Sequence, residues 1–366
     1  MRRRVADGAS VVVKVGSSSL AKPGGGLDDT GIKRAVGHVC GLAAVGYRPV
    51  LVTSGAVAAG LPALGLTARP RDLPGLQVAA AVGQGRLMER YARAFADHDT
   101  IVGQVLLTRD ILANRSQYLH ARAALTQMLA RRVVPVVNEN DTVVVDELRL
   151  GDNDRLAAIV GHLVGAGMLI ILTDTTGLFS ADPRIGDDAE LLSAVRHTDE
   201  ILDELYRSTG RGALGSGGVA TKIAAARMAA WSGIPTVVAD ARLDEVVRLA
   251  VDGHEVGTWI DPHESVLSAR KLWIAFGLPS EGSIAVDAGA ADAVVHRGRS
   301  LLAVGVVSVE GRFDSGAAVE VVDPAGALIA KGLAGLSAAA IEAVIGHHSS
   351  VAGGSVIHRD DLVVLR

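Results

Sequence analysis

Short apolar runs alternate along the chain with longer stretches in which apolar residues recur every three or four positions. Val11–Val15 and Val133–Val137 are runs of the first kind, and each has the length of a buried strand. Asp28–Val45 is a stretch of the second kind, because residues such as Ile32 and Val36 fall on one helical face. Strands and helices in this alternation predict a three-layer αβα sandwich with a mostly parallel central sheet.

The same alternation continues to about residue 260. Further strands are expected at Val50–Val52, Ile101–Leu107, Met168–Leu172, Thr236–Val238 and Val256–Ile260, and further helices at Leu76–Phe95, Leu119–Leu129, Thr221–Trp231 and Leu243–Val251. The pattern then changes at Gly277–Gly282, which is rich in turn residues. Beyond this junction the expected strands are short and closely spaced, at Ile284–Val286, Val294–His296, Ala303–Val309, Ala318–Val322 and Leu328–Ala330. We therefore expect two domains, residues 1–278 and a small β-rich barrel at residues 279–366.

Composition and charge exclude several classes of protein. The single cysteine, Cys40, excludes an internal disulfide and fits a reducing cytosol, and its helical spacing from Val36 marks a core thiol. Val11–Val15 is too short for the core of a signal peptide. Leu156–Leu172 is uncharged for nearly the length of a membrane span, but Gly165–Gly167 breaks it into a buried helix and a strand. We therefore expect a cytoplasmic protein without a membrane segment.

Amide and carboxylate side chains gather in the middle of the chain. Asn138–Asp141 follows directly on a predicted strand, and Gly151–Asp154 comes just before a predicted helix. In open α/β sheets, ligands bind beyond the carboxyl ends of the strands. Acids, amides and a helix N-terminus together suit a zwitterion, a metal ion or both.

Lys14 lies inside the first predicted strand, where an isolated ammonium group is costly. It therefore needs an anionic partner, either a bound phosphate or a structural carboxylate, and Gly16–Ser18 adds N–H and hydroxyl donors. Ser54 and Gly55 follow the second strand, where they suit an anion site or a simple N-cap equally well.

Two further segments bear on nucleotide binding. Thr173–Leu178 follows a strand and is either a tight turn or a nucleotide-contacting loop. Gly210–Gly215 matches G-x-G-x-x-G, but the segment before it looks helical, which argues against a Rossmann fold. Ser216–Lys222 offers flexible N–H donors, a hydroxyl and a lysine at the start of a helix. Two lysines on Gly/Ser loops with carboxylates between them suit in-line phosphoryl transfer.

Taken in order, nine segments of the chain resemble the amino-acid kinase family, and within it the kinases that act on free L-glutamate. They are Val13–Gly16, Val52–Ala56, Ala80–Gln84, Leu106–Arg109, Pro135–Asp141, Gly151–Asp154, Leu172–Asp174, Ala181–Arg184 and Gly217–Lys222. Together they cover the first domain almost end to end. Gly346–Ser349 and His358–Asp361 resemble the PUA domain that many of these kinases carry.

The resemblance implies ATP-dependent phosphorylation of the side-chain carboxylate of L-glutamate, with Mg²⁺, to L-glutamyl 5-phosphate for proline biosynthesis. It implies catalytic roles for Lys14, Lys222 and Asp154, in which Asp154 would orient the lysines or the magnesium shell. It implies glutamate binding by Ser54, Asp141 and Asn153, and it assigns no metal ligand. The implied nucleotide-binding residues are Lys14, Thr173, Asp174, Ser216, Gly217, Gly218, Val219, Ala220, Thr221 and Lys222.

Alternatives remain within the family, whose members also act on aspartate, N-acetylglutamate, uridylate or a carbamoyl group. The acidic and amide groups favour an acceptor with a free ammonium. Ser216 stands at a position where many members of the family have Thr, and Phe179 stands where many have Tyr.

The pathway suggests proline as an inhibitor at the glutamate site, and the labile product suggests transfer to glutamyl-phosphate reductase. We also expect a homo-oligomer, a dimer or tetramer. Residues 280–366 carry six lysines and arginines against ten acidic residues, which argues against RNA binding by the second domain.

Overall fold

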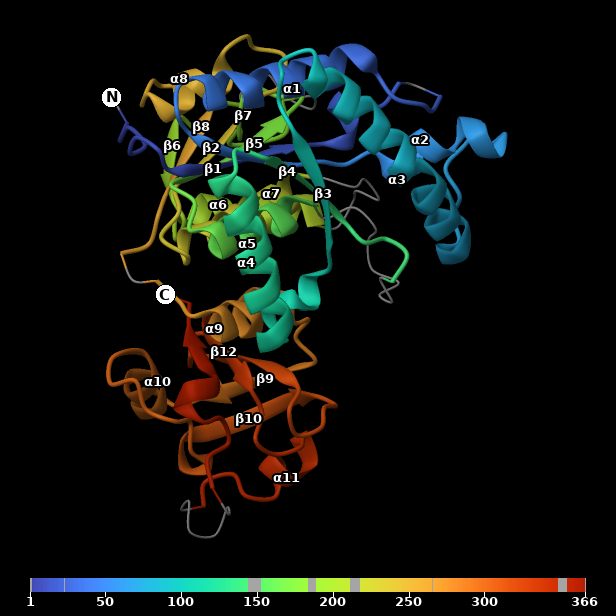
Figure 1. Cartoon of the computed structure of the whole chain (residues 1–366). Helices are drawn as coiled ribbons and strands as arrows, with labels where there is room; N and C mark the ends of the chain where they lie inside the picture. The colour runs from blue at the N-terminus through green and yellow to red at the C-terminus, as the bar shows by residue number, and fades with distance from the viewer. Residues whose placement is uncertain are drawn as a thin grey trace. The chain divides into compact units, whose positions relative to one another are not determined.

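A sheet of eight strands organises the first part of the chain in this computed structural model (Figure 1). Its order is β3-β4-β2-β1-β5-β7-β8-β6, and every neighbouring pair is parallel except β7 and β8. The strands are β1 (Ser10–Val15), β2 (Arg48–Val52), β3 (Val102–Leu107), β4 (Val134–Glu139), β5 (Met168–Thr173), β6 (Ala194–Arg196), β7 (Thr236–Asp240) and β8 (Thr258–Asp261). The predicted mostly parallel sheet is confirmed, and β6, which is only three residues long, was not expected from the sequence.

The structure describes residues 2–22, 24–143, 153–183, 189–210, 218–264, 266–347 and 354–365. Within these ranges, no helix combines the length and the apolar character that a membrane crossing needs. The described chain divides into two units, Met1–Val266 and Leu267–Arg366.

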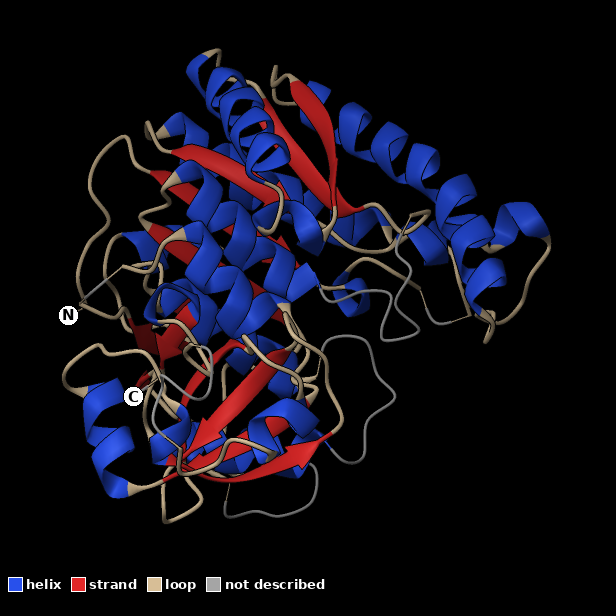
Figure 2. Cartoon of the chain, turned by 90° about the horizontal axis from the view of Figure 1, so that it is seen from below, coloured by secondary structure: helices blue, strands red, loops and turns tan. Residues whose placement is uncertain are grey.

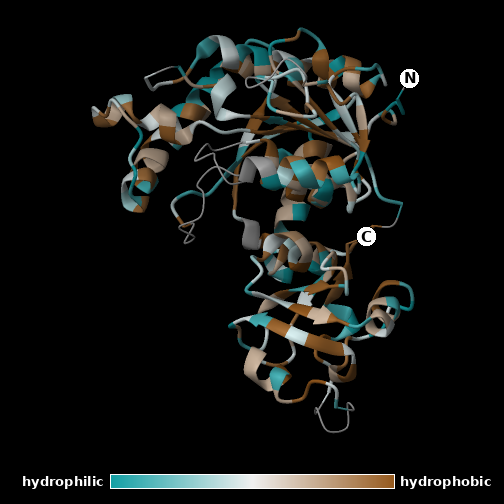
Figure 3. Cartoon of the chain, turned by 180° about the vertical axis from the view of Figure 1, so that it is seen from behind, coloured by the Kyte–Doolittle hydropathy of each residue, from teal (hydrophilic) through white to brown (hydrophobic). Residues whose placement is uncertain are grey.

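Helices cover both faces of the large sheet (Figures 1 and 2). They are α1 (Asp29–Ala44), α2 (Ala56–Gly60), α3 (Leu73–Ala96), α4 (Arg115–Ala130), α5 (Asn153–Val164), α6 (Glu200–Gly210), α7 (Val219–Ala230) and α8 (Val246–Val251). Helix α1 packs beside α3 and α8 on one face, while α5 packs beside α4 and α7 on the other. All residues of β1 and β5 are buried, as expected of central strands that are covered on both sides. The brown colour of Figure 3 marks apolar residues along the strands of the large sheet.

Two glycines let α2 and α3 pack together at backbone distance. A Cβ atom on Gly83 would lie 1.8 Å from the carbonyl oxygen of Ala56, and one on Gly60 would lie 2.0 Å from that of Ala79. Neither gap can hold a side chain. Because Ala56 begins α2 directly after the turn that follows β2, this contact holds α3 against that turn.

The second unit contains a five-stranded sheet in the order β10-β9-β11-β12-β13. Its elements are β9 (Gly282–Val286), α10 (Ala288–Val295), β10 (Val306–Gly311), β11 (Ala318–Val322), β12 (Leu328–Leu333), α11 (Ala338–Glu342) and β13 (Leu362–Val364). The strand expected at Val294–His296 is wrong, because these residues end α10 instead. Asp287 caps this helix by accepting a hydrogen bond from the Ala290 N–H, and its alanines favour helix.

The second unit begins at Leu267, earlier than the boundary expected after residue 278. The helical segment α9 (Ala269–Leu272) and the π-helical turn Trp273–Gly277 account for the difference. Ile274 packs in one apolar cluster with Val363 of β13. The buried ammonium of Lys331 on β12 donates to the Leu278 carbonyl, which fastens the end of the turn to the small sheet.

We expect Gly83→Ala to destabilise the protein by about 1–3 kcal/mol, because the added methyl group meets the backbone of α2. Thermal unfolding measures this as a lower midpoint. Gly85→Ala is the matched control on the same helix, since a Cβ atom there meets nothing within 4 Å. That control is expected to be neutral or stabilising by up to about 1 kcal/mol. Equal midpoints for the two variants would contradict the close packing of α2 on α3.

Candidate active site

A buried carboxylate holds two lysines at the carboxyl end of the large sheet. Asp154, in the first turn of α5, places Oδ1 2.5 Å from Lys14 Nζ and Oδ2 3.6 Å from Lys222 Nζ. Lys14 comes from β1 and Lys222 from the first turn of α7, and all three side chains are at least nine-tenths buried. The sequence left open whether Lys14 faces a phosphate or a carboxylate, and in this structure its anionic partner is the Asp154 carboxylate.

The charges of this triad act on one another's proton affinity. Burial alone would raise the pKa of Asp154, but the two lysines and hydrogen bonds from Lys14 and Thr221 outweigh it and lower that pKa to about 2. Burial lowers the pKa of Lys222, and the nearby Lys14 adds to this, while Asp154 and Asp174 act in the opposite direction. The carboxylate therefore stays ionised at any physiological pH.

Thr221 ties the start of α7 to the same carboxylate. Its Oγ1 lies 2.7 Å from Asp154 Oδ2 and 2.8 Å from the carbonyl oxygen of Gly218, the residue that precedes the helix. No side chain among the described residues caps this helix, so Val219 and Ala220 begin it with backbone N–H groups that an anion can bind. The predicted residues Ser216 and Gly217 lie outside the described residues, as do Gly151, Asp152 and Arg184.

Thr173 and Asp174 lie at the carboxyl end of β5, next to β1 in the sheet. Thr173 is buried, and its Oγ1 donates to Asp174 Oδ1 at 3.1 Å. Asp174 is exposed, and its carbonyl accepts a hydrogen bond from the Arg242 guanidinium at 3.0 Å. Because the charge of Asp174 acts on Lys222, the end of β5 and the start of α7 border the same region.

A second group of residues surrounds the amide of Asn153. Its Nδ2 lies 2.8 Å from the carbonyl oxygen of Thr53, 3.0 Å from Ser54 Oγ and 3.0 Å from Asn138 Oδ1. The Asn138 amide in turn donates to Gln84 Oε1 at 2.8 Å. The structure thus brings together the predicted pair Ser54 and Asn153, which are far apart in the sequence.

Sequence reasoning placed Asn138 only within the cluster Asn138–Asp141, without a role of its own, and it assigned no role to Gln84. Asn138 occupies a buried position of β4, and a polar residue at the end of an apolar run was the available signal. Gln84 lies in the middle of α3, in a segment that the sequence marked only by resemblance. Its contact depends on the close approach of α3, which no local pattern encodes.

Asp141 follows β4 in the turn beside this group. Burial raises the pKa of its carboxyl to about 6, although the charge of Arg69 acts in the opposite direction. Within the described residues, no hydrogen bond joins Asp141 to Ser54 or Asn153. Asp141 therefore follows the strand that carries Asn138, but it is separate from the hydrogen bonds around Asn153.

The described residues contain no group of three or more histidine, cysteine or acidic side chains that could hold a metal ion. The Asp154 carboxylate already contacts the two lysines and accepts a hydrogen bond from the Thr221 hydroxyl. Magnesium often binds through substrate phosphates with few protein ligands, so these residues suit a metal that arrives with a nucleotide.

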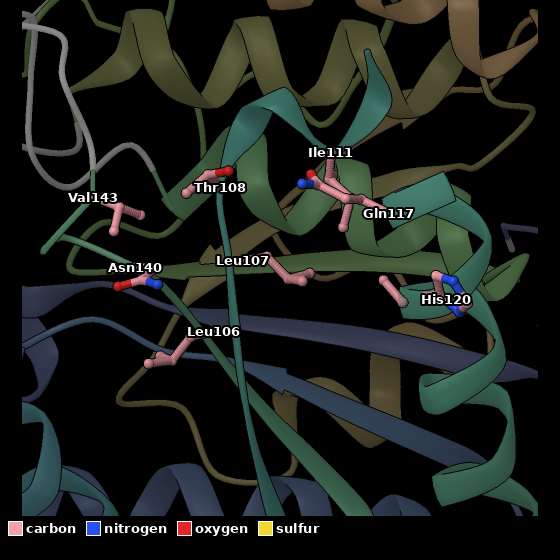
Figure 4. A pocket seen from close by; sticks show the side chains of 9 residues that line it. Leu106, Leu107, Thr108, Ile111, Gln117, His120, Asn140 and Val143 are labelled. Atoms are coloured by element: carbon pink, nitrogen blue, oxygen red, sulfur yellow. The ribbon is translucent and has the colours of Figure 1, made fainter. Parts of the chain in front are cut away.

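A pocket of about 370 Å³ opens beside the turn after β4 (Figure 4). Residues from the end of β3, the start of α4 and this turn line it: Leu106, Leu107, Thr108, Ile111, Gln117, His120, Ala121, Asn140 and Val143. Leu106–Thr108 therefore borders this pocket, together with the turn Asn140–Val143, which contains Asp141.

Comparison with known proteins agrees with this geometry. The amino acid kinase family matches residues 9–240, and the PUA domain matches residues 282–351. Glutamate 5-kinases from Citrifermentans bemidjiense and Moorella thermoacetica are each 46% identical, over 97% of this chain and 97% and 96% of their own. One from Pseudomonas fluorescens (strain Pf-5) is 44% identical over the whole of both chains. The chain therefore belongs to the amino acid kinase family, as a kinase with a PUA domain.

Proposed function

We propose that the protein transfers the terminal phosphoryl group of ATP to the side-chain carboxylate of L-glutamate. The products are ADP and L-glutamyl 5-phosphate, the first intermediate of proline biosynthesis. The observation that supports this most is the pairing of Lys14 and Lys222 through the single buried carboxylate of Asp154. The choice of glutamate as the acceptor rests on the relatives, which are glutamate 5-kinases.

Phosphoryl transfer to a carboxylate needs charge neutralisation more than proton transfer. A side-chain carboxylate is ionised near neutral pH and is already a nucleophile, so the reaction needs no general base. One P–O bond forms to the glutamate oxygen while the bond to the ADP oxygen breaks, and negative charge spreads over the transferring group. Lys14 and Lys222 would stabilise this charge, and Asp154 would hold both ammonium groups in place.

On the nucleotide side, we assign ATP to the region bordered by the end of β5 and the start of α7. Thr173 and Asp174 would contact the nucleotide, and Ser216–Lys222 would present N–H donors and a lysine to its phosphates. A magnesium ion bound to these phosphates would supply further charge neutralisation.

On the acceptor side, we assign L-glutamate to Ser54, Asp141 and Asn153. The Asn153 Oδ1 is buried and has no hydrogen-bond partner among the described residues, so it can accept from the ammonium group. Asp141 would add a negative charge that favours a free ammonium over an acylated nitrogen. This arrangement supports free glutamate over N-acetylglutamate.

The direct test is ADP release from ATP and magnesium with glutamate, aspartate, N-acetylglutamate or uridylate as acceptor. Glutamate-dependent release is the expected result. Release with another acceptor would keep the phosphoryl-transfer site and overturn the acceptor assignment.

Regulation and assembly follow from the same proposal. Proline would inhibit by occupying the glutamate site, and excess glutamate would then relieve the inhibition. We also propose a cytoplasmic homo-oligomer, a dimer or tetramer, that passes its labile product to glutamyl-phosphate reductase.

Lys222→Ala is expected to lower kcat by about a hundred- to a thousandfold, because a positive charge on the transferring group is lost. The dissociation constant of glutamate should change by less than about threefold, since Lys222 lies on the nucleotide side. Initial rates and calorimetric titration measure the two quantities. Lys33→Ala, at an exposed position of α1, is the control. A wild-type kcat in the Lys222 variant would remove its assigned role.

Asp141 should make glutamate binding depend on pH. Its raised pKa of about 6 means that the carboxyl is protonated below that pH and loses its attraction for an ammonium group. The KM for glutamate is therefore expected to rise as the pH falls through about 6, with the nucleotide saturating. In Asp141→Asn, KM should be about tenfold higher at neutral pH, and this step should disappear. Asp97→Asn, at an exposed position, is the control and should keep the pH-dependent rise in KM. If Asp141→Asn also keeps this rise, Asp141 does not have the proposed role.

A further inference from the structure

Three side-chain amides form a short chain of hydrogen bonds whose direction is fixed at one end. The Thr53 carbonyl can only accept, so the Asn153 atom 2.8 Å away must be the amide nitrogen. The Asn138 atom that faces this nitrogen must then be its oxygen. The other end of the Asn138 amide is therefore a donor, which requires the oxygen of Gln84. The orientation of all three amides follows from one backbone carbonyl.

The chain leaves one unsatisfied atom at each end. Asn153 Oδ1 is an acceptor and Gln84 Nε2 is a donor, and both are buried without a hydrogen-bond partner among the described residues. Buried amide groups are normally satisfied, so this pair indicates a missing partner. The Gln84 and Asn153 amides both bond to the Asn138 side chain, so the free donor and the free acceptor lie at the two ends of one connected group of amides.

An α-amino acid carries the complementary pair on one carbon atom. Its ammonium group donates and its α-carboxylate accepts, whereas a nucleotide phosphate or a single metal ion would satisfy only one of the two atoms. The inference rests on the proposed function and adds a residue to its acceptor site.

We propose that Gln84 is a specificity-determining residue that donates from Nε2 to the α-carboxylate of the amino-acid acceptor, while Asn153 Oδ1 accepts from its ammonium group. Gly83 makes this position possible. Its missing side chain lets α3 approach the backbone of α2 at Ala56, which brings Gln84 to within a hydrogen bond of Asn138 on β4. A glutamine at the surface of a long helix thereby becomes part of the acceptor site.

Gln84→Glu tests this with little change in shape. The new carboxylate still accepts from Asn138, but it replaces the free N–H donor with an oxygen. For L-glutamate we expect KM to rise about ten- to a hundredfold, with kcat within about threefold of the wild type. L-isoglutamine has a carboxamide in place of the α-carboxylate, and its NH₂ can donate to the new oxygen. The ratio of kcat/KM for L-isoglutamine to kcat/KM for glutamate should therefore be higher in the variant than in the wild type.

Gln127→Glu is the matched control, since it makes the same change on the exposed face of α4. Gln84→Met is a second variant of similar size that lacks both polar atoms. It should raise KM for glutamate without improving isoglutamine, and it keeps the test valid if the charged variant fails to fold. An unchanged KM and an unchanged preference between the two acceptors in a folded variant would overturn the inference.

Calorimetric titration of glutamate separates this inference from the proposed reaction. Weaker glutamate binding in both Gln84 variants supports the inference even if the wild type shows no ADP release, and only the reaction would then fail. Equal binding by the wild type and both folded variants would overturn the inference whatever the turnover.

Discussion

The site depends on one constraint, which is that a buried charge must have a partner. Lys14 lies in the central strand of a sheet covered on both faces, so its ammonium group cannot reach bulk water. Asp154 meets this need from the start of α5, and the same carboxylate also holds Lys222 and the Thr221 hydroxyl of α7. Three elements are thereby fixed relative to one another. Removal of Asp154 would leave two buried ammonium groups close together, so the triad is a structural requirement as well as the centre of the proposed reaction.

The sequence was sufficient to predict most of the first unit, because strands buried on both faces read as unbroken apolar runs. Val11–Val15 and Met168–Leu172 are examples, and both match observed strands to within a residue. The same logic explains why Ser54 and Asn153, which are far apart in the sequence, lie within a hydrogen bond of each other. Both follow or begin an element at the carboxyl edge of a parallel sheet, and such positions converge in space.

Sequence reasoning missed two kinds of signal, a local helix cap and contacts between residues that are far apart in the sequence. Val294–His296 is an apolar pair followed by a histidine, and two apolar residues cannot separate strand from helix, so the cap at Asp287 decided the outcome. The segment Leu267–Gly277 belongs to the second unit through Val363 and Lys331, which are far away in the sequence. The same limit applies to Gln84, because its hydrogen bond to Asn138 depends on how closely α3 approaches α2.

The two halves of the site solve the problem of burial in different ways. On the side where we propose phosphoryl transfer, charges neutralise one another, so Asp154 stays ionised and the lysines stay in place. On the side where we propose that the acceptor binds, amides satisfy each other except at the two ends of their chain. Charged groups must be paired in advance because the cost of an unpaired charge is large, whereas a single unmade amide hydrogen bond is a cost that a folded protein can bear. In the proposed site these unmade bonds would select the ligand, because a ligand that fails to complete both of them gains little binding free energy.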